Sequence, residues 1–162
     1  MNCKQSAALE LQMSVNLDPS CPVFKEELWG EGDLLAGIRS LIKESETQGS
    51  VTIHLFHDRV PSGLSSSRRL AILCIVREAL TNAVRHAKTK RVLVTLCRRG
   101  RVIELSVEDN GIGFDVERRR RSSTPTNGLL VMEERAARAG GRLSIRSFLR
   151  GGTTVIAKIP LD

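Results

Sequence analysis

Residues 106–114 read Ser-Val-Glu-Asp-Asn-Gly-Ile-Gly-Phe, and the fold of the chain depends on this stretch. Residues 101–108 alternate apolar and polar side chains, which predicts a strand that ends here. Asp109 follows at the strand end, where its carboxylate can accept hydrogen bonds from an exocyclic amine. Gly111 and Gly113 lack a Cβ, so the backbone can approach a flat or charged ligand closely. Asp-Asn-Gly is also an ordinary turn signal, so this pattern needs support from elsewhere in the chain.

Three other stretches support it. Residues 77–87 read Arg-Glu-Ala-Leu-Thr-Asn-Ala-Val-Arg-His-Ala, residues 127–136 read Asn-Gly-Leu-Leu-Val-Met-Glu-Glu-Arg-Ala, and residues 151–154 read Gly-Gly-Thr-Thr. In sequence order, the four stretches resemble the N box, the Asp-x-Gly-x-Gly box, the second glycine box and the terminal Gly-Gly-Thr of the GHKL ATPases. That superfamily joins histidine kinases with gyrase, Hsp90 and MutL. The resemblance covers residues 33–162, and residues 77–87 look most like the ATP-binding domain of sensor histidine kinases that feed NarL-type response regulators.

Length and composition are those of one soluble globular domain. With 162 residues, 41% hydrophobic and 27% charged, the chain has room for one core and a tail. No apolar run approaches the roughly 18 to 20 residues needed to cross a bilayer, and the N-terminus lacks the pattern of a secretion signal. The four cysteines show no metal or redox spacing, and Cys74 and Cys97 lie within apolar runs. These features predict a reduced, cytoplasmic protein without a membrane segment.

The chain is basic, with a net charge of +7. Such a charge is typical of nucleic-acid-binding proteins, but the basic residues are dispersed apart from clusters at residues 98–99 and 118–121. No aromatic residues lie between them to stack on bases. A polyphosphate ligand explains a local excess of positive charge equally well, so we do not expect direct nucleic-acid binding.

The periodicity of the chain predicts an α+β fold. Residues 1–32 have no clean period and are predicted to be a tail or remnant linker, and residues 33–162 form the domain. Asp33 is the expected N-cap of a helix that Gly49 closes. The expected elements begin with a helix over 34–47, a strand over 51–56 and a helix from 65–67 to 87. Strands over 92–97 and 102–107, joined by a hairpin at 98–101, come next. A helix that includes 133–139 and ends at Gly140-Gly141 follows, and then strands over 143–148 and 153–159. This order predicts a two-layer α/β sandwich with a mixed, mostly antiparallel sheet and helices on one face, which is also the GHKL (Bergerat) fold.

The helix over residues 65–87 carries a polar face. Glu78, Asn82, Arg85 and His86 share one side at about 100° per residue. A solvated face of an amphipathic helix would look the same. However, the acid and the amide are embedded in apolar sequence, where they need partners, and a hydrated Mg²⁺ is a suitable partner for their oxygen atoms.

The resemblance implies a role for each of these residues. Asn82 matches the N-box asparagine that holds Mg²⁺ through its side-chain oxygen, and Glu78 matches the acid that polarises the attacking group. Arg85 and His86 match positions that reach the phosphates of ATP. These roles are consistent with phosphoryl transfer, which depends on positioning and on charge neutralisation by metal and cations.

The glycine boxes receive their expected roles in the same way. The resemblance implies that Asp109 accepts the adenine amino group, that Gly111 and Gly113 allow close approach of the ligand, and that Thr153 reaches the adenine side. Gly128 opens a helix, where free backbone N–H groups favour phosphate. Leu129, which follows it in the second glycine box, is counted with the nucleotide-binding residues. The second glycine box departs from the usual pattern because Val131 stands where a glycine is expected, which predicts weaker nucleotide binding rather than none.

Residues 114–127 are polar and non-periodic, which predicts a mobile loop over the ligand and corresponds to the ATP lid of the family. The basic run at residues 118–121 within it either clamps phosphates or contacts a partner, or it is simply solvated.

A complete histidine kinase also needs a phosphoacceptor histidine on a dimerising helical hairpin. The only histidines are His54, His57 and His86. His57-Asp58 follows a strand with no long helix around it, so it is not the expected acceptor. We therefore expect a catalytic module that is separate from its hairpin, monomeric, and partnered by a hairpin domain and a NarL-type response regulator. Alternatives are a nucleotide-binding regulatory module, such as an anti-sigma-type serine kinase or a non-catalytic ATP binder, and a basic nucleic-acid-binding domain.

Overall fold

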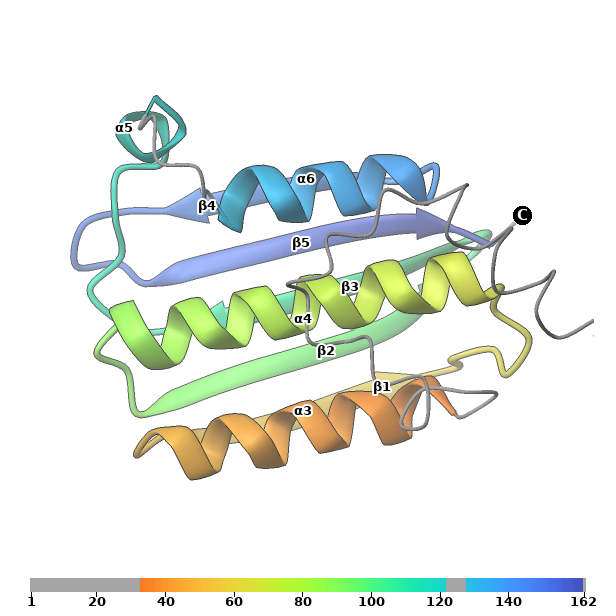
Figure 1. The fold of residues 1–162 in the computed structure, drawn as a ribbon, viewed down its shortest axis with the longest axis horizontal. Helices are drawn as coiled ribbons and strands as arrows, with labels where there is room; N and C mark the ends of the chain where they lie inside the picture. Colours follow the sequence, from red (N-terminus) through yellow and green to blue (C-terminus); the bar gives the residue numbers. More distant parts are fainter. Residues whose placement is uncertain (1–32, 122–127, 162) are drawn as a thin grey trace, which may run out of the picture. The chain divides into compact units, whose positions relative to one another are not determined.

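The structure, a computed structural model, describes residues 33–121 and 128–161. The predicted tail at residues 1–32 and the second half of the predicted loop at residues 122–127 lie outside the described residues. The elements, in chain order, are α3 (Leu34–Gln48), β1 (Thr52–Asp58), α4 (Ser66–His86), β2 (Arg91–Arg99), β3 (Val102–Asp109), α5 (Val116–Arg120), α6 (Gly128–Arg138), β4 (Arg142–Ser147) and β5 (Thr153–Pro160) (Figure 1).

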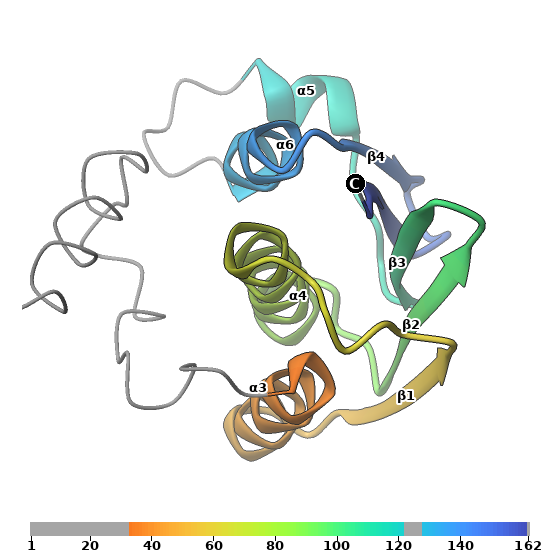
Figure 2. The same ribbon diagram turned by 90° about the vertical axis from the view of Figure 1, so that its right-hand side faces the viewer.

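The five strands of the described residues form one mixed sheet in the order β1-β2-β3-β5-β4. Only β1 and β2 run parallel, because α4 connects them as a crossover, and the other neighbours are antiparallel. The predicted hairpin between β2 and β3 is confirmed, and Gly100 in its turn adopts a φ of 63°. Helices α3, α4 and α6 cover one face of this sheet, as Figure 2 shows. The predicted two-layer sandwich is therefore confirmed.

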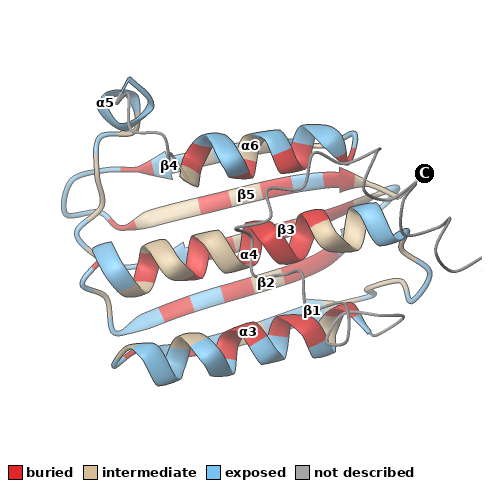
Figure 3. Ribbon diagram, viewed as in Figure 1, coloured by how far each residue is buried: buried red, intermediate tan, exposed pale blue. Residues whose placement is uncertain are grey.

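The core lies between the sheet and the three long helices, where buried residues gather on facing sides (Figure 3). Alternate residues of β2 and β3 point into it, among them Val94, Leu96 and Leu105, which are fully buried. Cys74 and Cys97, which lie within apolar runs of the sequence, are buried in this core.

The central helix α4 buries a wider face than its sequence period predicts. A single apolar stripe at helical spacing would include Leu70 and Val84, which are only half-buried, and would omit Ile72, Cys74 and Ile75, which are buried. The reason is that α4 lies between α3 and α6 as well as on the sheet, so three of its sides meet other elements.

Helix α3 begins as predicted but ends for a different reason. The side chain of Asp33 caps its start by accepting a hydrogen bond from the backbone N–H of Leu35 at 3.2 Å. Gly49 follows its end with an extended backbone (φ −147°) rather than the left-handed conformation of a glycine cap. A Cβ at position 49 would lie 2.7 Å from Cγ1 of Val84, so glycine here allows the end of α3 to pack against α4.

Candidate functional site

A cavity of about 240 Å³ opens where β3 ends and β5 begins, beneath the last turns of α4 and the first turns of α6. Most of its wall is apolar, and the larger apolar side chains that line it are Val107, Ile112, Phe114, Leu129, Met132 and Val155. Its polar and charged lining residues are Asn82, His86, Asp109, Arg119 and Thr153. An apolar cavity with a few convergent polar groups is the usual form of a small-molecule site.

The cavity brings together most of the residues that the sequence singled out. Asn82, His86, Asp109, Gly113, Gly128, Leu129 and Thr153 all line it. Glu78, Arg85 and Gly111 do not. The apolar lining from β3, α6 and β5 was not predicted as part of the site, because strand alternation marks these residues only as core.

Asp109 is the half-buried acid of the cavity. Its Oδ1 accepts a hydrogen bond from the backbone N–H of Gly111 at 2.8 Å. Burial raises the pKa of the Asp109 carboxyl above its ordinary value, and hydrogen bonds from the backbones of Gly111 and Thr153 oppose that rise. The site therefore presents a partly desolvated hydrogen-bond acceptor among apolar side chains.

The two glycines of the Asp-x-Gly-x-Gly stretch allow the loop after β3 to lie in close contact with the backbone of other segments. A Cβ on Gly111 would overlap with the carbonyl oxygen of Ala87, and one on Gly113, whose φ is 61°, would overlap with the carbonyl oxygen of Phe148. The backbone N–H of Ile112 also donates to the Ala87 carbonyl at 2.8 Å. The sequence interpretation gives both glycines the role of letting a ligand approach closely. The structure gives a packing reason for them as well, because the loop after β3 is held between the end of α4 and the β4–β5 turn.

Thr153 is held by a residue that the sequence analysis missed. Its hydroxyl oxygen lies 2.9 Å from the hydroxyl oxygen of Ser147, which is buried at the end of β4. The alternation of β4 provides the missing signal, because Leu143 and Ile145 share the inward face of the strand with Ser147. A polar residue at an inward position needs partners and is therefore worth inspection.

The polar face of α4 divides into two parts. Asn82 is half-buried and lines the cavity with His86, whereas Arg85 is exposed and lies outside the lining. Glu78, one turn before Asn82, is half-buried and lies against the first residue of α6. A Cβ on Gly128 would overlap with its Oε1 atom.

A short helix, α5, occupies part of the region that was predicted to be an irregular loop. That prediction is wrong for residues 116–120. No residue of α5 is buried, so it has no apolar period to detect. Its start is capped by Asp115, whose Oδ1 accepts a hydrogen bond from the backbone N–H of Arg118 at 3.0 Å.

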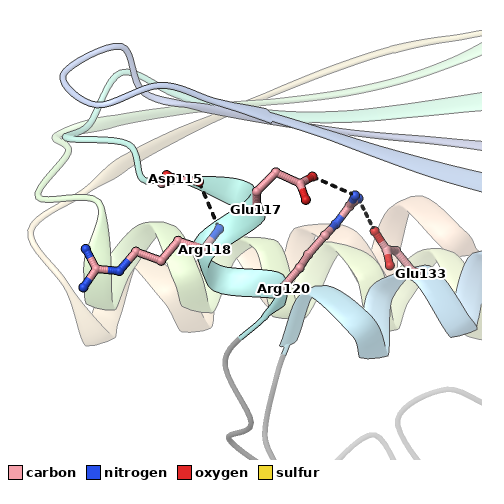
Figure 4. A network of polar contacts seen from close by, with 5 residues as sticks. All are labelled: Asp115, Glu117, Arg118, Arg120 and Glu133. Carbon is pink, nitrogen blue, oxygen red and sulfur yellow. Dashed lines mark hydrogen bonds and ion pairs between the residues drawn. The ribbon is translucent and has the colours of Figure 1, made fainter.

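An ion pair holds α5 against α6, as Figure 4 shows. Arg120 lies 2.6 Å from Glu133 of α6 and 3.5 Å from Glu117 of its own helix. Arg119, next to this contact, lines the cavity. Of the basic run at residues 118–121, then, one member joins the site and another attaches α5 to the domain. Val131, where the family pattern has glycine, is 44% exposed and lies outside the cavity lining.

The profile of the family described as "Histidine kinase-, DNA gyrase B-, and HSP90-like ATPase" matches residues 67–162. The sensor protein VraS of Staphylococcus saprophyticus is 32% identical over 143 residues, which are 86% of this chain and 37% of VraS. The sensor histidine kinase LiaS of Bacillus subtilis is 33% identical over 134 residues, 83% of this chain and 36% of LiaS. The nitrate/nitrite sensor protein NarX of Escherichia coli is 28% identical over 126 residues, 78% of this chain and 21% of NarX.

Solved structures agree on the fold. The Acinetobacter baumannii histidine kinase AdeS superimposes with a TM-score of 0.67 at 17% identity, covering 80% of this chain and 66% of that one. A histidine kinase domain from Erythrobacter litoralis superimposes with a TM-score of 0.61 at 21% identity, covering 85% of this chain and 68% of that one.

The chain belongs to the histidine kinase-, DNA gyrase B-, and HSP90-like ATPase family, and the predicted GHKL domain is confirmed. It spans a fifth to somewhat over a third of the length of the curated sensor kinases described above. Within the described residues, no helix combines the length and apolarity needed to cross a bilayer.

Proposed function

We propose that this chain is the ATP- and Mg²⁺-binding catalytic domain of a two-component sensor histidine kinase, which supplies the γ-phosphate to a histidine on another segment or chain. The observation that carries the proposal is the place of Asp109: a half-buried carboxylate in an apolar cavity whose rim holds Asn82, His86 and Arg119. A flat base suits the apolar part, and a charged triphosphate suits the rim.

Asp109 and Thr153 would recognise the base. The carboxylate of Asp109 accepts hydrogen bonds, so it favours a base with an amino group over one with a carbonyl oxygen at the same position. Val107, Ile112 and Val155 would cover the faces of the ring. The cavity volume of about 240 Å³ suits a base better than a whole nucleotide, so the phosphates would extend to the rim.

The rim has the groups that a polyphosphate needs. His86 and Arg119 line the cavity and would contact phosphate oxygens, and the backbone N–H groups of Gly128 and Leu129 open α6 beside them. Arg85 is exposed just outside the lining and would contribute long-range attraction.

The donor set fits Mg²⁺ bound chiefly through ATP. In the described residues, no group of three or more His, Cys, Asp or Glu side chains could hold a metal by itself. Mg²⁺ commonly keeps waters and substrate phosphate oxygens with few protein ligands, and the side-chain oxygen of Asn82 would supply such a ligand. When bound, the ion would neutralise charge that develops on the phosphates.

Glu78 would polarise the attacking group. Its carboxylate lies at the start of α6, next to the proposed phosphate-binding N–H groups, and it is not part of the wall around the base. A carboxylate near the γ-phosphate can accept a proton from the incoming nucleophile.

The acceptor would come from elsewhere. His54 and His57 are exposed and lie on a strand, β1, rather than on a helix, and His57 accepts a hydrogen bond from Arg39 of α3 at 3.3 Å. We propose a histidine hairpin as the direct partner and a NarL-type response regulator downstream, in the cytoplasm, with the isolated domain monomeric and without direct nucleic-acid binding.

The first experiment is calorimetric titration of ATP into the protein with and without Mg²⁺. We expect Mg²⁺-dependent binding that Asp109→Asn abolishes and that Asn82→Ala weakens mainly in its metal dependence. If the intact protein does not bind ATP, the proposed function is wrong.

A second experiment separates the kinase from a regulatory module. The protein is incubated with labelled ATP and a histidine-hairpin protein from a sensor kinase. Acid-labile phosphohistidine is expected, whereas acid-stable phosphoserine on a partner would favour the anti-sigma-type serine kinase.

A further inference from the structure

The buried hydroxyl of Ser147 joins two segments of the cavity wall, the loop after β3 and the start of β5. It accepts a hydrogen bond from the backbone N–H of Phe114 at 2.9 Å and donates one to the carbonyl oxygen of Gly152 at 3.0 Å. It also lies 2.9 Å from the hydroxyl of Thr153. Phe114 and Thr153 line the cavity, whereas Ser147 is only 9% exposed and stands behind them.

The direction of the last hydrogen bond follows from counting protons. A serine hydroxyl has one proton and two lone pairs. The Gly152 carbonyl can only accept a hydrogen bond, so the Ser147 proton points to it. The Phe114 N–H can only donate, so it uses one lone pair of the Ser147 oxygen. The second lone pair of Ser147 is left for Thr153, whose hydroxyl must then be the donor. If Ser147 donated to Thr153 instead, the hydroxyl oxygen of Ser147 and the carbonyl oxygen of the buried Gly152 would lie 3.0 Å apart with no proton between them.

This direction determines what Thr153 offers to a ligand. Its proton is engaged with Ser147, so only lone pairs remain for the cavity. Asp109 pairs with Thr153 across β3 and β5, and its carboxylate is also an acceptor. Two neighbouring acceptors complement a nitrogen that carries two N–H bonds, and they repel a carbonyl oxygen.

We propose that Ser147 is a positioning residue for base selectivity. Because Ser147 accepts the hydrogen bond from the Thr153 hydroxyl, Thr153 presents only lone pairs to the cavity and becomes a second acceptor beside Asp109. The two acceptors together exclude 6-oxopurines. The proposal rests on the proposed ATP site. It adds a cause of selectivity that Asp109 alone does not supply, because a free threonine hydroxyl could rotate and donate to a carbonyl oxygen.

The test compares ATP with inosine triphosphate, in which a carbonyl oxygen replaces the amino group and N1 carries a proton. Both nucleotides are titrated with Mg²⁺ into the wild type and Ser147→Ala, and the ratio of their affinities is the readout. In Ser147→Ala the Thr153 hydroxyl is free to turn toward the cavity, so we expect the preference for ATP to fall about three- to ten-fold, the size of one neutral hydrogen bond. Ser147→Thr retains a hydroxyl and should restore the preference.

Thr153 provides a second route if Ser147→Ala does not fold, which thermal melting will reveal. Thr153→Val removes the acceptor with little change in shape and should lower the same ratio, while Thr153→Ser should keep it. In a Thr153→Val background, Ser147→Ala should change the ratio no further, although it still lowers the melting temperature.

The outcomes are distinct. If Ser147→Ala weakens ATP and inosine triphosphate by the same factor, or if Thr153→Val keeps the wild-type ratio, Ser147 is only structural and the inference is overturned while the ATP site stands. If the wild type binds neither nucleotide, or Asp109→Asn binds ATP normally, the proposed function fails and the inference fails with it.

Discussion

The carboxylate of Glu78 on α4 lies against the α-carbon of Gly128, the first residue of α6, so closely that a side chain at position 128 would occupy the place of its Oε1 atom. The two residues are 50 positions apart in the chain. Gly128 thus has a second reason to be glycine besides opening a helix, because it leaves room for the proposed catalytic carboxylate of Glu78.

This contact predicts the effect of Gly128→Ala. The new methyl group would displace Glu78, and we expect phosphotransfer to a histidine-hairpin protein to fall about 10- to 100-fold, as misplaced catalytic groups commonly do. ATP affinity should change less, since Glu78 does not line the cavity and alanine at position 128, which does line it, keeps the backbone N–H. Radiolabel transfer and calorimetry measure the two quantities. The matched control is Gly128→Ala combined with Glu78→Asp, whose shorter side chain should recover part of the rate; undiminished transfer by Gly128→Ala alone would contradict the prediction.

Asp109 predicts a pH-dependent stability difference. Burial raises its folded-state pKa, so the folded state binds this proton more tightly than the unfolded chain does. Its contribution to stability is therefore greatest below the unfolded pKa of about 3.8 and is lost as the pH rises through the folded pKa. Asp109→Asn cannot ionise and keeps an oxygen that can accept from Gly111.

We therefore expect the melting temperature of Asp109→Asn, relative to wild type, to increase between about pH 4 and pH 7. Differential scanning calorimetry across this range measures it, and taking the difference cancels groups common to both proteins. A difference that decreases with pH would show that the hydrogen bonds to the carboxylate outweigh its burial.

At Gly113 we expect a single added methyl group to lower the free energy of unfolding strongly. Gly113→Ala combines a left-handed φ of 61° with overlap against the Phe148 carbonyl oxygen. Gly100→Ala is the matched control, because its φ is 63° but nothing lies within 4 Å of the new Cβ. We expect about 1 to 2 kcal/mol of destabilisation for Gly100→Ala from the backbone alone and a clearly larger loss for Gly113→Ala. Urea denaturation measures both, and equal losses would mean that the loop around Gly113 can move aside.

We expect loss of the Arg120–Glu133 ion pair to weaken binding of the ATP phosphates without affecting binding of the base. Both side chains are partly exposed, so Glu133→Gln should hardly change global stability. It should release α5 and with it Arg119, and so weaken ATP binding about two- to five-fold while leaving adenosine binding unchanged. The charge-swapped pair, Arg120→Glu with Glu133→Arg, should recover the affinity. Equal weakening of adenosine and ATP would show that the ion pair supports the base pocket instead.

Local sequence was sufficient to predict the fold class and to select several of the residues that line the cavity. Strand alternation in residues 101–108 and the 3.6-residue period of α4 are properties of neighbouring residues, so they are readable without tertiary information. The placement of Asn82 and His86 on one helix face, and of Asp109 at a strand end, follows from the same periods, and the cavity contains all three.

Where sequence reasoning failed, the cause is contact between distant residues. Helix α5 was read as a loop because its stability comes from the Asp115 cap and from Glu133 on another helix, neither of which produces an apolar period. Ser147 was missed because its importance depends on Phe114, 33 positions away. Gly49 was read as a helix cap because a local signal exists for that role and none exists for packing against Val84.

By itself, then, the sequence determined the order of the elements, the family to which the chain belongs and the polar groups available to the site, because these depend on residue type and short-range spacing. Only the tertiary structure decided which of those groups share one cavity, that Gly111 and Gly113 serve chain packing, that Glu78 stands at the start of α6, and that Ser147 orients Thr153. These relations depend on the sheet order β1-β2-β3-β5-β4 and on the helices laid across it, which bring chemically matched atoms from distant positions into contact.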